Sequence, residues 1–166
     1  YFKGLSQPSQ VLTLLSEMKA ITDIPILFTI RSEKEGGESI ALSEDEKISL
    51  IIAVAKESEV EVIDYEVFNP EEQVKKVRKA IDGTDKKLIL SYHNFNKTPD
   101  NDTLLAIAKE MVTRGADLVK IAVMPHSKDE VFRLLSITRL IDKTVNLPII
   151  TMAMGDLGKI SRIIGW

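Results

Sequence analysis

Polar residues within or just after apolar runs carry the chemistry that this sequence could perform. Lys120 lies inside the apolar run 118–124, where a lysine is almost never fully buried without a reason. Burial disfavours a charged ammonium, and a neutral amine can attack a carbonyl to form a Schiff base. Alternatively, the strand ends at this lysine and the side chain reaches water. The pattern by itself favours neither interpretation.

The two histidines of the chain each follow an apolar run. His93 comes after the run 88–92, where catalytic groups of parallel α/β folds gather. Imidazole exchanges protons near neutral pH, so His93 is a candidate general acid/base, and a loop histidine that bonds backbone groups is an equally good interpretation. For His126 we favour the structural role, because Pro125 already turns the chain away.

Charged residues follow two further runs. Arg31 and Glu35 lie after the run 24–30, where a solvated loop is the default interpretation and an arginine that binds an anionic or hydroxyl-rich substrate is the functional one. Asp64 and Glu66 end the next run and share one face of a strand, which is costly unless both are partnered. Every predicted strand thus contributes to one set: Arg31, Glu35, Asp64, Glu66, His93, Lys120 and Met152.

The elements that must position these residues alternate between two periodicities. Apolar runs of strand length cover 24–30, 60–64, 88–92, 118–123 and 148–152. Amphipathic stretches between these runs predict helices. A further helix is predicted over about 9–21, before the first run, and a short one from Lys159, after the last. The predicted starts are a capping box from Ser43 to Glu46, Asn69 as N-cap before Pro70, Asp100 or Asn101, and Ser127. This alternation predicts a parallel sheet, as an open doubly wound sheet or a (β/α)8 barrel.

Composition excludes several classes of function. Lys plus Arg number 22 and Asp plus Glu 25, a net charge of −3, so there is no basic excess to hold a nucleic acid. Cysteine is absent, which excludes disulfides, Cys-ligated zinc, iron–sulfur clusters and a thiol nucleophile. No apolar run approaches the roughly 18 residues of a membrane span. Because residues 1–4 lack the pattern of a signal peptide, we expect a cytoplasmic protein without a membrane partner.

Six segments appear in order over nearly the whole chain: FTIRSEKEGGE (28–38), IDYE (63–66), SYHNFNKTP (91–99), VKIAVMP (119–125), ITMAMG (150–155) and ISR (160–162). Together they resemble the type I 3-dehydroquinate dehydratases of the shikimate pathway, which serves aromatic amino acid biosynthesis. The resemblance implies a (β/α)8 barrel and the dehydration of 3-dehydroquinate to 3-dehydroshikimate. It further implies syn elimination through a lysine Schiff base, no metal or organic cofactor, and a homodimer.

The same resemblance assigns roles to individual residues. It implies Lys120 as the Schiff-base lysine, His93 as the general acid/base, Glu35 as the acidic residue beside that histidine and Asp64 as the carboxylate that supports the pair. Substrate binding would fall to Arg31, to Arg162 on the substrate carboxylate, and to the pocket methionines Met152 and Met154. Thr98 belongs to the matching segment but is assigned to the loop.

The sequence departs from the family pattern at both ends. Tyr1-Phe2 matches an aromatic pair that follows a substrate-binding Glu-x-Arg motif, so that motif would precede residue 1, and a loop with Ser and Gln would follow Trp166. We therefore expect residues 1–166 to be one domain, the central part of a barrel without its first two strands and its last strand. A class I aldolase-like barrel and a non-catalytic α/β binding domain stay open as alternatives.

Overall fold

The described part of the chain forms two compact units. The computed structural model describes residues 7–164, so the aromatic pair Tyr1-Phe2 and Trp166 lie outside the described residues. The first unit comprises residues 1–65 and 69–88, and the second comprises residues 66–68 and 89–166.

Five parallel strands confirm the predicted alternation. They are β1 (Leu27–Thr29), β2 (Val62–Glu66), β3 (Lys87–Asn94), β4 (Leu118–Val123) and β5 (Ile149–Ala153), and their order in the sheet is the order in the chain. Each lies within a few residues of its predicted position. β3 extends two residues beyond the predicted end at Tyr92, because its ladder with β4 continues to the pair Asn94–Val123.

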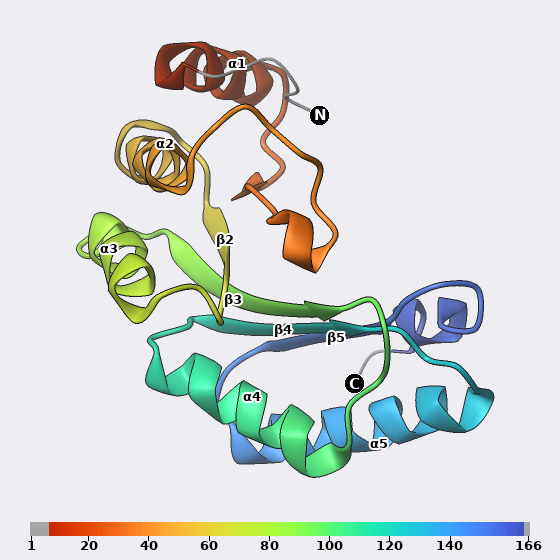
Figure 1. Ribbon diagram of the computed structural model, residues 1–166. Helices are drawn as coiled ribbons and strands as arrows, with labels where there is room; N and C mark the ends of the chain where they lie inside the picture. The colour runs from red at the N-terminus through yellow and green to blue at the C-terminus, as the bar shows by residue number, and fades with distance from the viewer. Residues whose placement is uncertain (1–6, 165–166) are drawn as a thin grey trace. The chain divides into compact units, whose positions relative to one another are not determined.

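In the first unit, three helices pack beside β1 and β2: α1 (Pro8–Ile21), α2 (Glu44–Glu57) and α3 (Glu71–Ile81). The predicted capping box begins α2, since the Ser43 hydroxyl accepts from the Glu46 amide and the Glu46 carboxylate accepts from the Ser43 amide. Figure 1 shows α2 packing against both α1 and α3. Buried apolar side chains form the core of this unit: Leu15, Ile51, Val54, Ile63, Val74, Val77 and Ile81.

The start of α3 corrects the predicted N-cap by one residue. Pro70, not Asn69, is the N-cap, because its carbonyl accepts from the amides of Gln73 and Val74 at 2.9 and 3.2 Å. An N-cap backbone has only to accept these bonds, so the missing N–H of proline costs nothing there.

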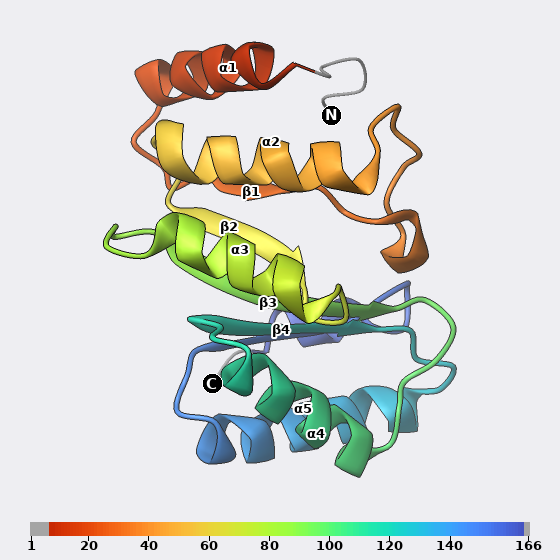
Figure 2. The ribbon, with the colours of Figure 1, turned by 60° about the vertical axis from the view of Figure 1, so that its left-hand side comes forward.

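In the second unit, two helices cover one face of β3, β4 and β5: α4 (Asn101–Thr113) and α5 (Lys128–Thr144). Figure 2 shows them side by side beneath the strands. The side chains of Asp100 and Ser127 cap these helices as predicted, and Gly115 follows the C-cap of α4 with a φ of 86°. The predicted short helix is the 3-10 turn η2 (Lys159–Arg162).

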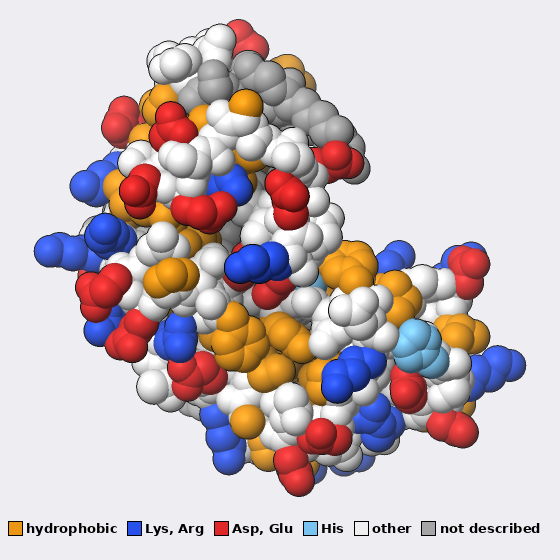
Figure 3. All heavy atoms as spheres, in the orientation of Figure 1, with side chains coloured by type: hydrophobic (Ala, Val, Ile, Leu, Met, Phe, Trp, Pro, Cys, Tyr) orange, Lys and Arg blue, Asp and Glu red, His pale blue; other side chains and the backbone are white. Residues whose placement is uncertain are grey.

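Charges of both signs are interspersed over the face that Figure 3 presents, in keeping with the small net charge. Between residues 7 and 164, no helix has the length and apolar character needed to cross a membrane.

Candidate active site

Lys120 lies in the middle of β4, so the predicted alternative of a strand that ends at this lysine is wrong. Its neighbours in the ladder are Ser91 on β3 and Ile150 on β5. On β5 the hydroxyl of Thr151 bonds that of Thr138 on α5 at 2.7 Å, which places Thr151 on the helix-covered face. Side chains alternate along a strand, so Ile150, and Lys120 beside it, face away from α4 and α5.

His93 lies on the same face of the sheet as Lys120. The sequence placed it after the strand, but it is part of β3 and pairs with Ala122, two residues beyond Lys120 along β4. The strand spacing puts the Cα atoms of His93 and Lys120 about 8 Å apart, within the reach of their side chains. Both residues are half-buried. Ser91 lies on the same face at the level of Lys120, directly opposite it in the ladder, and is fully buried.

The methionines and Arg162 lie at the carboxyl end of β5. Met152 is opposite Ala122 and so shares the face of Lys120 and His93. Met154 follows the strand, and its amide donates to the Val123 carbonyl at 2.8 Å. Arg162 is the last residue of η2 and is exposed. The strand register therefore puts Met152 on the same face as Lys120 and His93. Arg162 lies in the turn η2 that follows β5.

In the first unit, Arg31, Asp64 and Glu35 form one ionic cluster. Nη2 of Arg31 donates to Oδ1 of Asp64 at 2.8 Å, and Nη1 of Arg31 lies 3.8 Å from Oε2 of Glu35. The Asp64 side chain is fully buried, and those of Arg31 and Glu35 are 15% and 12% exposed. Tyr65 donates its hydroxyl to Gln73 on α3, so Asp64, its neighbour on β2, faces away from that helix.

A glycine turn holds Glu35 against Arg31. Glu35 ends the 3-10 turn η1 (Glu33–Glu35), and Gly36 follows with a φ of 83°. The Gly37 amide donates to the Ser32 carbonyl at 2.8 Å, and a Cβ on Gly37 would lie 2.0 Å from the Arg31 carbonyl oxygen. The turn can fold back onto the end of β1 only because residue 37 has no side chain.

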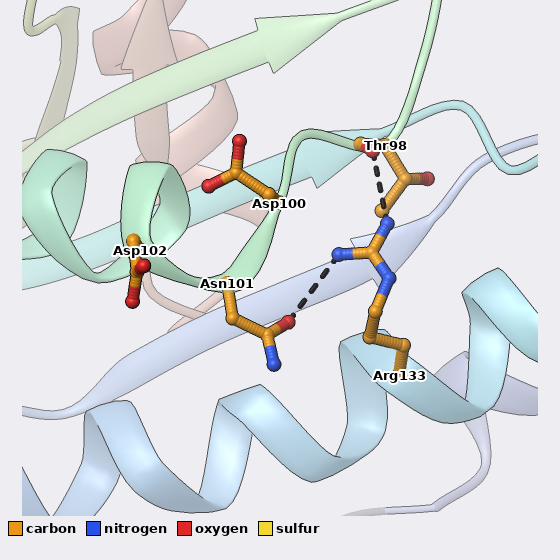
Figure 4. Close-up of a pocket in the computed structure, with 5 residues that line it drawn as sticks. All are labelled: Thr98, Asp100, Asn101, Asp102 and Arg133. Carbon is orange, nitrogen blue, oxygen red and sulfur yellow. Dashed lines mark hydrogen bonds between the residues drawn. The ribbon is translucent and has the colours of Figure 1, made fainter.

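The loop after β3 is fixed by polar contacts that come from two other segments. Arg133 on α5 donates to the carbonyls of Pro99 and Thr98 at 2.6 and 3.0 Å. Figure 4 shows its bonds to Thr98 and to the side chain of Asn101. Nε2 of His126 lies 2.6 Å from the Asn96 carbonyl oxygen, a backbone contact that agrees with the structural role favoured for His126.

An open pocket lies at this loop, lined by Thr98, Asp100, Asn101, Asp102 and Arg133. The pocket lies beside α4 and α5, which cover the face of the sheet opposite Lys120. The Thr98 hydroxyl is buried and makes no hydrogen bond within residues 7–164. In the same part of the chain, no group of three or more acidic or histidine side chains could hold a metal ion.

Comparison with known proteins identifies the family. The model of the type I 3-dehydroquinase family matches residues 1–166. The chain belongs to the type I 3-dehydroquinase family. Its relatives in this family include the 3-dehydroquinate dehydratases of Aromatoleum aromaticum, 41% identical over 100% of this chain, and of Geobacillus thermodenitrificans, 42% identical over 99%. The chain spans 64% of the length of each of these relatives.

Solved structures of type I 3-dehydroquinases have the same fold. The crystal structure of 3-dehydroquinate dehydratase from Geobacillus kaustophilus matches 99% of this chain with a TM-score of 0.95 at 40% identity, and the match covers 64% of that protein. A Clostridium difficile type I enzyme, crystallised with covalently modified comenic acid, matches 99% with a TM-score of 0.94 at 38% identity, over 66% of its length. The predicted fold class, an incomplete (β/α)8 barrel, is confirmed.

Proposed function

We propose that this chain is the catalytic part of a 3-dehydroquinate dehydratase that works through a Schiff base on Lys120. The observation that carries the proposal is the position of Lys120 in the interior of β4, on the face that it shares with His93. An amine held among apolar neighbours is suited to attack a ketone, and a histidine at the next level of the sheet can move the protons. The covalently modified ligand of the Clostridium difficile relative supports covalent chemistry in this family.

The proposed reaction removes one water overall. The Lys120 amine attacks the C3 ketone of 3-dehydroquinate, and loss of water gives a protonated imine. This imine withdraws electrons from C2, so that His93 can take the C2 proton and leave an enamine. The C1 hydroxyl then leaves with a proton from His93 as water, on the same face of the ring. A second water hydrolyses the imine, restores the lysine and releases 3-dehydroshikimate.

We assign the remaining residues by the same resemblance. Glu35 and Asp64 match the acidic residues that support the catalytic histidine, and both contact Arg31, for which we propose a substrate-binding role. Arg162 would hold the substrate carboxylate, since a guanidinium can form two parallel hydrogen bonds with it. Met152 and Met154 would line the pocket. We further propose that the enzyme belongs to the shikimate pathway, acts in the cytoplasm and needs no cofactor beyond the lysine.

Borohydride trapping tests the proposal. We expect reduction in the presence of 3-dehydroquinate to leave an adduct that peptide mapping assigns to Lys120, and K120A to leave none. An adduct on another residue, or no adduct in the unmodified protein, would refute the Schiff-base role. Retro-aldol products in a substrate panel would favour an aldolase instead.

Histidine variants separate binding from proton transfer. H93A should lower turnover by about 100- to 10,000-fold while imine formation survives in part. H126A is the matched control, because the ring of His126 contacts the backbone carbonyl of Asn96. The turnover of H126A should stay near that of the unmodified protein. Equal turnover of H93A and the unmodified protein would refute the role of His93.

We also propose that the complete enzyme is a homodimer and that its barrel includes strands beyond these residues. The relatives exceed this chain in length by about a third of their own residues, which supports the second point. Light scattering on the gene product that carries this chain tests the first, with a mass of twice one chain as the expected result.

A further inference from the structure

The hydroxyl of Ser161 joins the end of β5 to the turn η2. It accepts a hydrogen bond from the Ala153 amide at 3.0 Å and donates one to the Gly158 carbonyl at 2.7 Å. The Ser161 amide also donates to the Gly158 carbonyl, at 3.0 Å. Ser161 is only 6% exposed and Ala153 is fully buried, so water does not substitute for either side-chain bond.

The Ser161 hydroxyl takes the place of a strand carbonyl at the outer edge of β5. The next amide, that of Met154, donates to Val123 on the β4 side. Successive amides of a strand point to opposite sides, so the Ala153 amide points away from β4 and needs an acceptor there. Ser161 supplies that acceptor from a residue eight positions further along the chain.

The turn between them lies directly against the strand. A Cβ on Gly158 would lie 2.0 Å from the Ala153 carbonyl oxygen, so the backbone at this point approaches the strand as closely as glycine allows. Gly155, with a φ of 67°, makes the bend that directs the chain back. The position of η2 against β5 thus depends on one close backbone approach at Gly158, one bend at Gly155 and one buried hydroxyl.

We propose that Ser161 is a positioning residue for Arg162, its neighbour in the same turn. Arg162 is exposed and is the last residue of η2, directly after Ser161. Two parallel bonds to a carboxylate require the guanidinium in a defined place, and an anchor on the adjacent residue supplies it. This inference rests on the proposed function, in which Arg162 binds the substrate carboxylate.

A double-mutant cycle on the gene product that carries this chain tests the inference. We expect S161A to raise KM for 3-dehydroquinate by about 10-fold with kcat little changed, because only substrate binding is weakened. R162A should raise KM by about 100-fold. The double variant should match R162A, since Ser161 then has nothing left to position. Multiplied effects in the double variant would overturn the inference.

Further variants keep the result interpretable. S161C retains the size and a weaker hydrogen bond, so its KM should lie between those of the unmodified protein and S161A, and it serves in place of S161A if that variant does not fold. S136A removes an exposed serine of α5 and should leave KM unchanged. A KM of S161C equal to that of the unmodified protein would show that the hydrogen bonds of the Ser161 hydroxyl do not position Arg162.

Borohydride trapping on Lys120 separates the two proposals. An adduct in the unmodified protein together with independent effects of S161A and R162A would overturn the positioning role alone. An absent adduct would overturn the proposed function and the inference with it. An R162A variant with unchanged KM would remove the substrate role of Arg162 and would likewise overturn the inference.

Discussion

Replacing Asp64 by asparagine should destabilise the first unit by removing the charge that Arg31 faces. Asp64→Asn keeps the volume and one oxygen but leaves a guanidinium that is only 15% exposed without its nearest carboxylate, 2.8 Å away. Removal of one partner from a buried pair costs about 3–5 kcal/mol. Arg31 retains some access to water and lies 3.8 Å from Glu35, which offsets part of the loss. We therefore expect a loss of about 2 kcal/mol.

Urea denaturation of the gene product that carries this chain measures this loss, with Asp82→Asn as the control. Asp82 pairs with Arg78 at 3.1 Å, but its side chain is 59% exposed. An exposed pair of this kind contributes about 0.5 kcal/mol or less. The reasoning predicts a much larger decrease in the urea midpoint for D64N than for D82N. Equal midpoints for the two variants would show that burial does not strengthen the Arg31–Asp64 pair.

Three further predictions follow from particular contacts. Thr98→Val should leave stability unchanged or raise it by up to about 1 kcal/mol in urea denaturation, because the buried hydroxyl makes no hydrogen bond within the described residues. Thr138→Val loses two hydrogen bonds of 2.7 Å and should cost about 1–3 kcal/mol. A Thr98→Val variant less stable than Thr138→Val would contradict this prediction. Gly158→Ala should cost about 3 kcal/mol because its Cβ meets a backbone carbonyl, whereas Gly83→Ala meets no atom within 4 Å and should cost about 1 kcal/mol, from its φ of 77° alone. The Asp100 carboxylate accepts hydrogen bonds from the backbone N–H and from the side chain of Thr103, and these bonds hold the pKa of Asp100 below its ordinary value. Its contribution to stability is therefore complete above about pH 3.9 and is lost as pH falls through the lower folded pKa; thermal melts of D100N, which keeps the cap, should lack this acid step.

Local patterns were sufficient to predict the elements. The capping box at Ser43, the N-caps Asp100 and Ser127, and the five apolar runs all depend on residues within one or two turns of one another, and each appears in the structure. The errors were of one to three residues, at Pro70, at the end of β3 and at the ends of β1 and β2. Strand ends depend on how far a neighbouring strand continues the ladder, which no local pattern specifies.

The sequence by itself determined which residue types could do chemistry and on which strands they lie. The tertiary structure decided how they are arranged. Register places His93 on the face of Lys120, and the ion pair of Arg31 with Asp64 joins residues that are 33 positions apart. Ser161 and Gly37 received no role from the sequence, because a serine or glycine in a loop has no distinguishing pattern. Their roles arise from backbone groups brought within hydrogen-bonding or contact distance by the fold, and such proximity is a property of the packed chain.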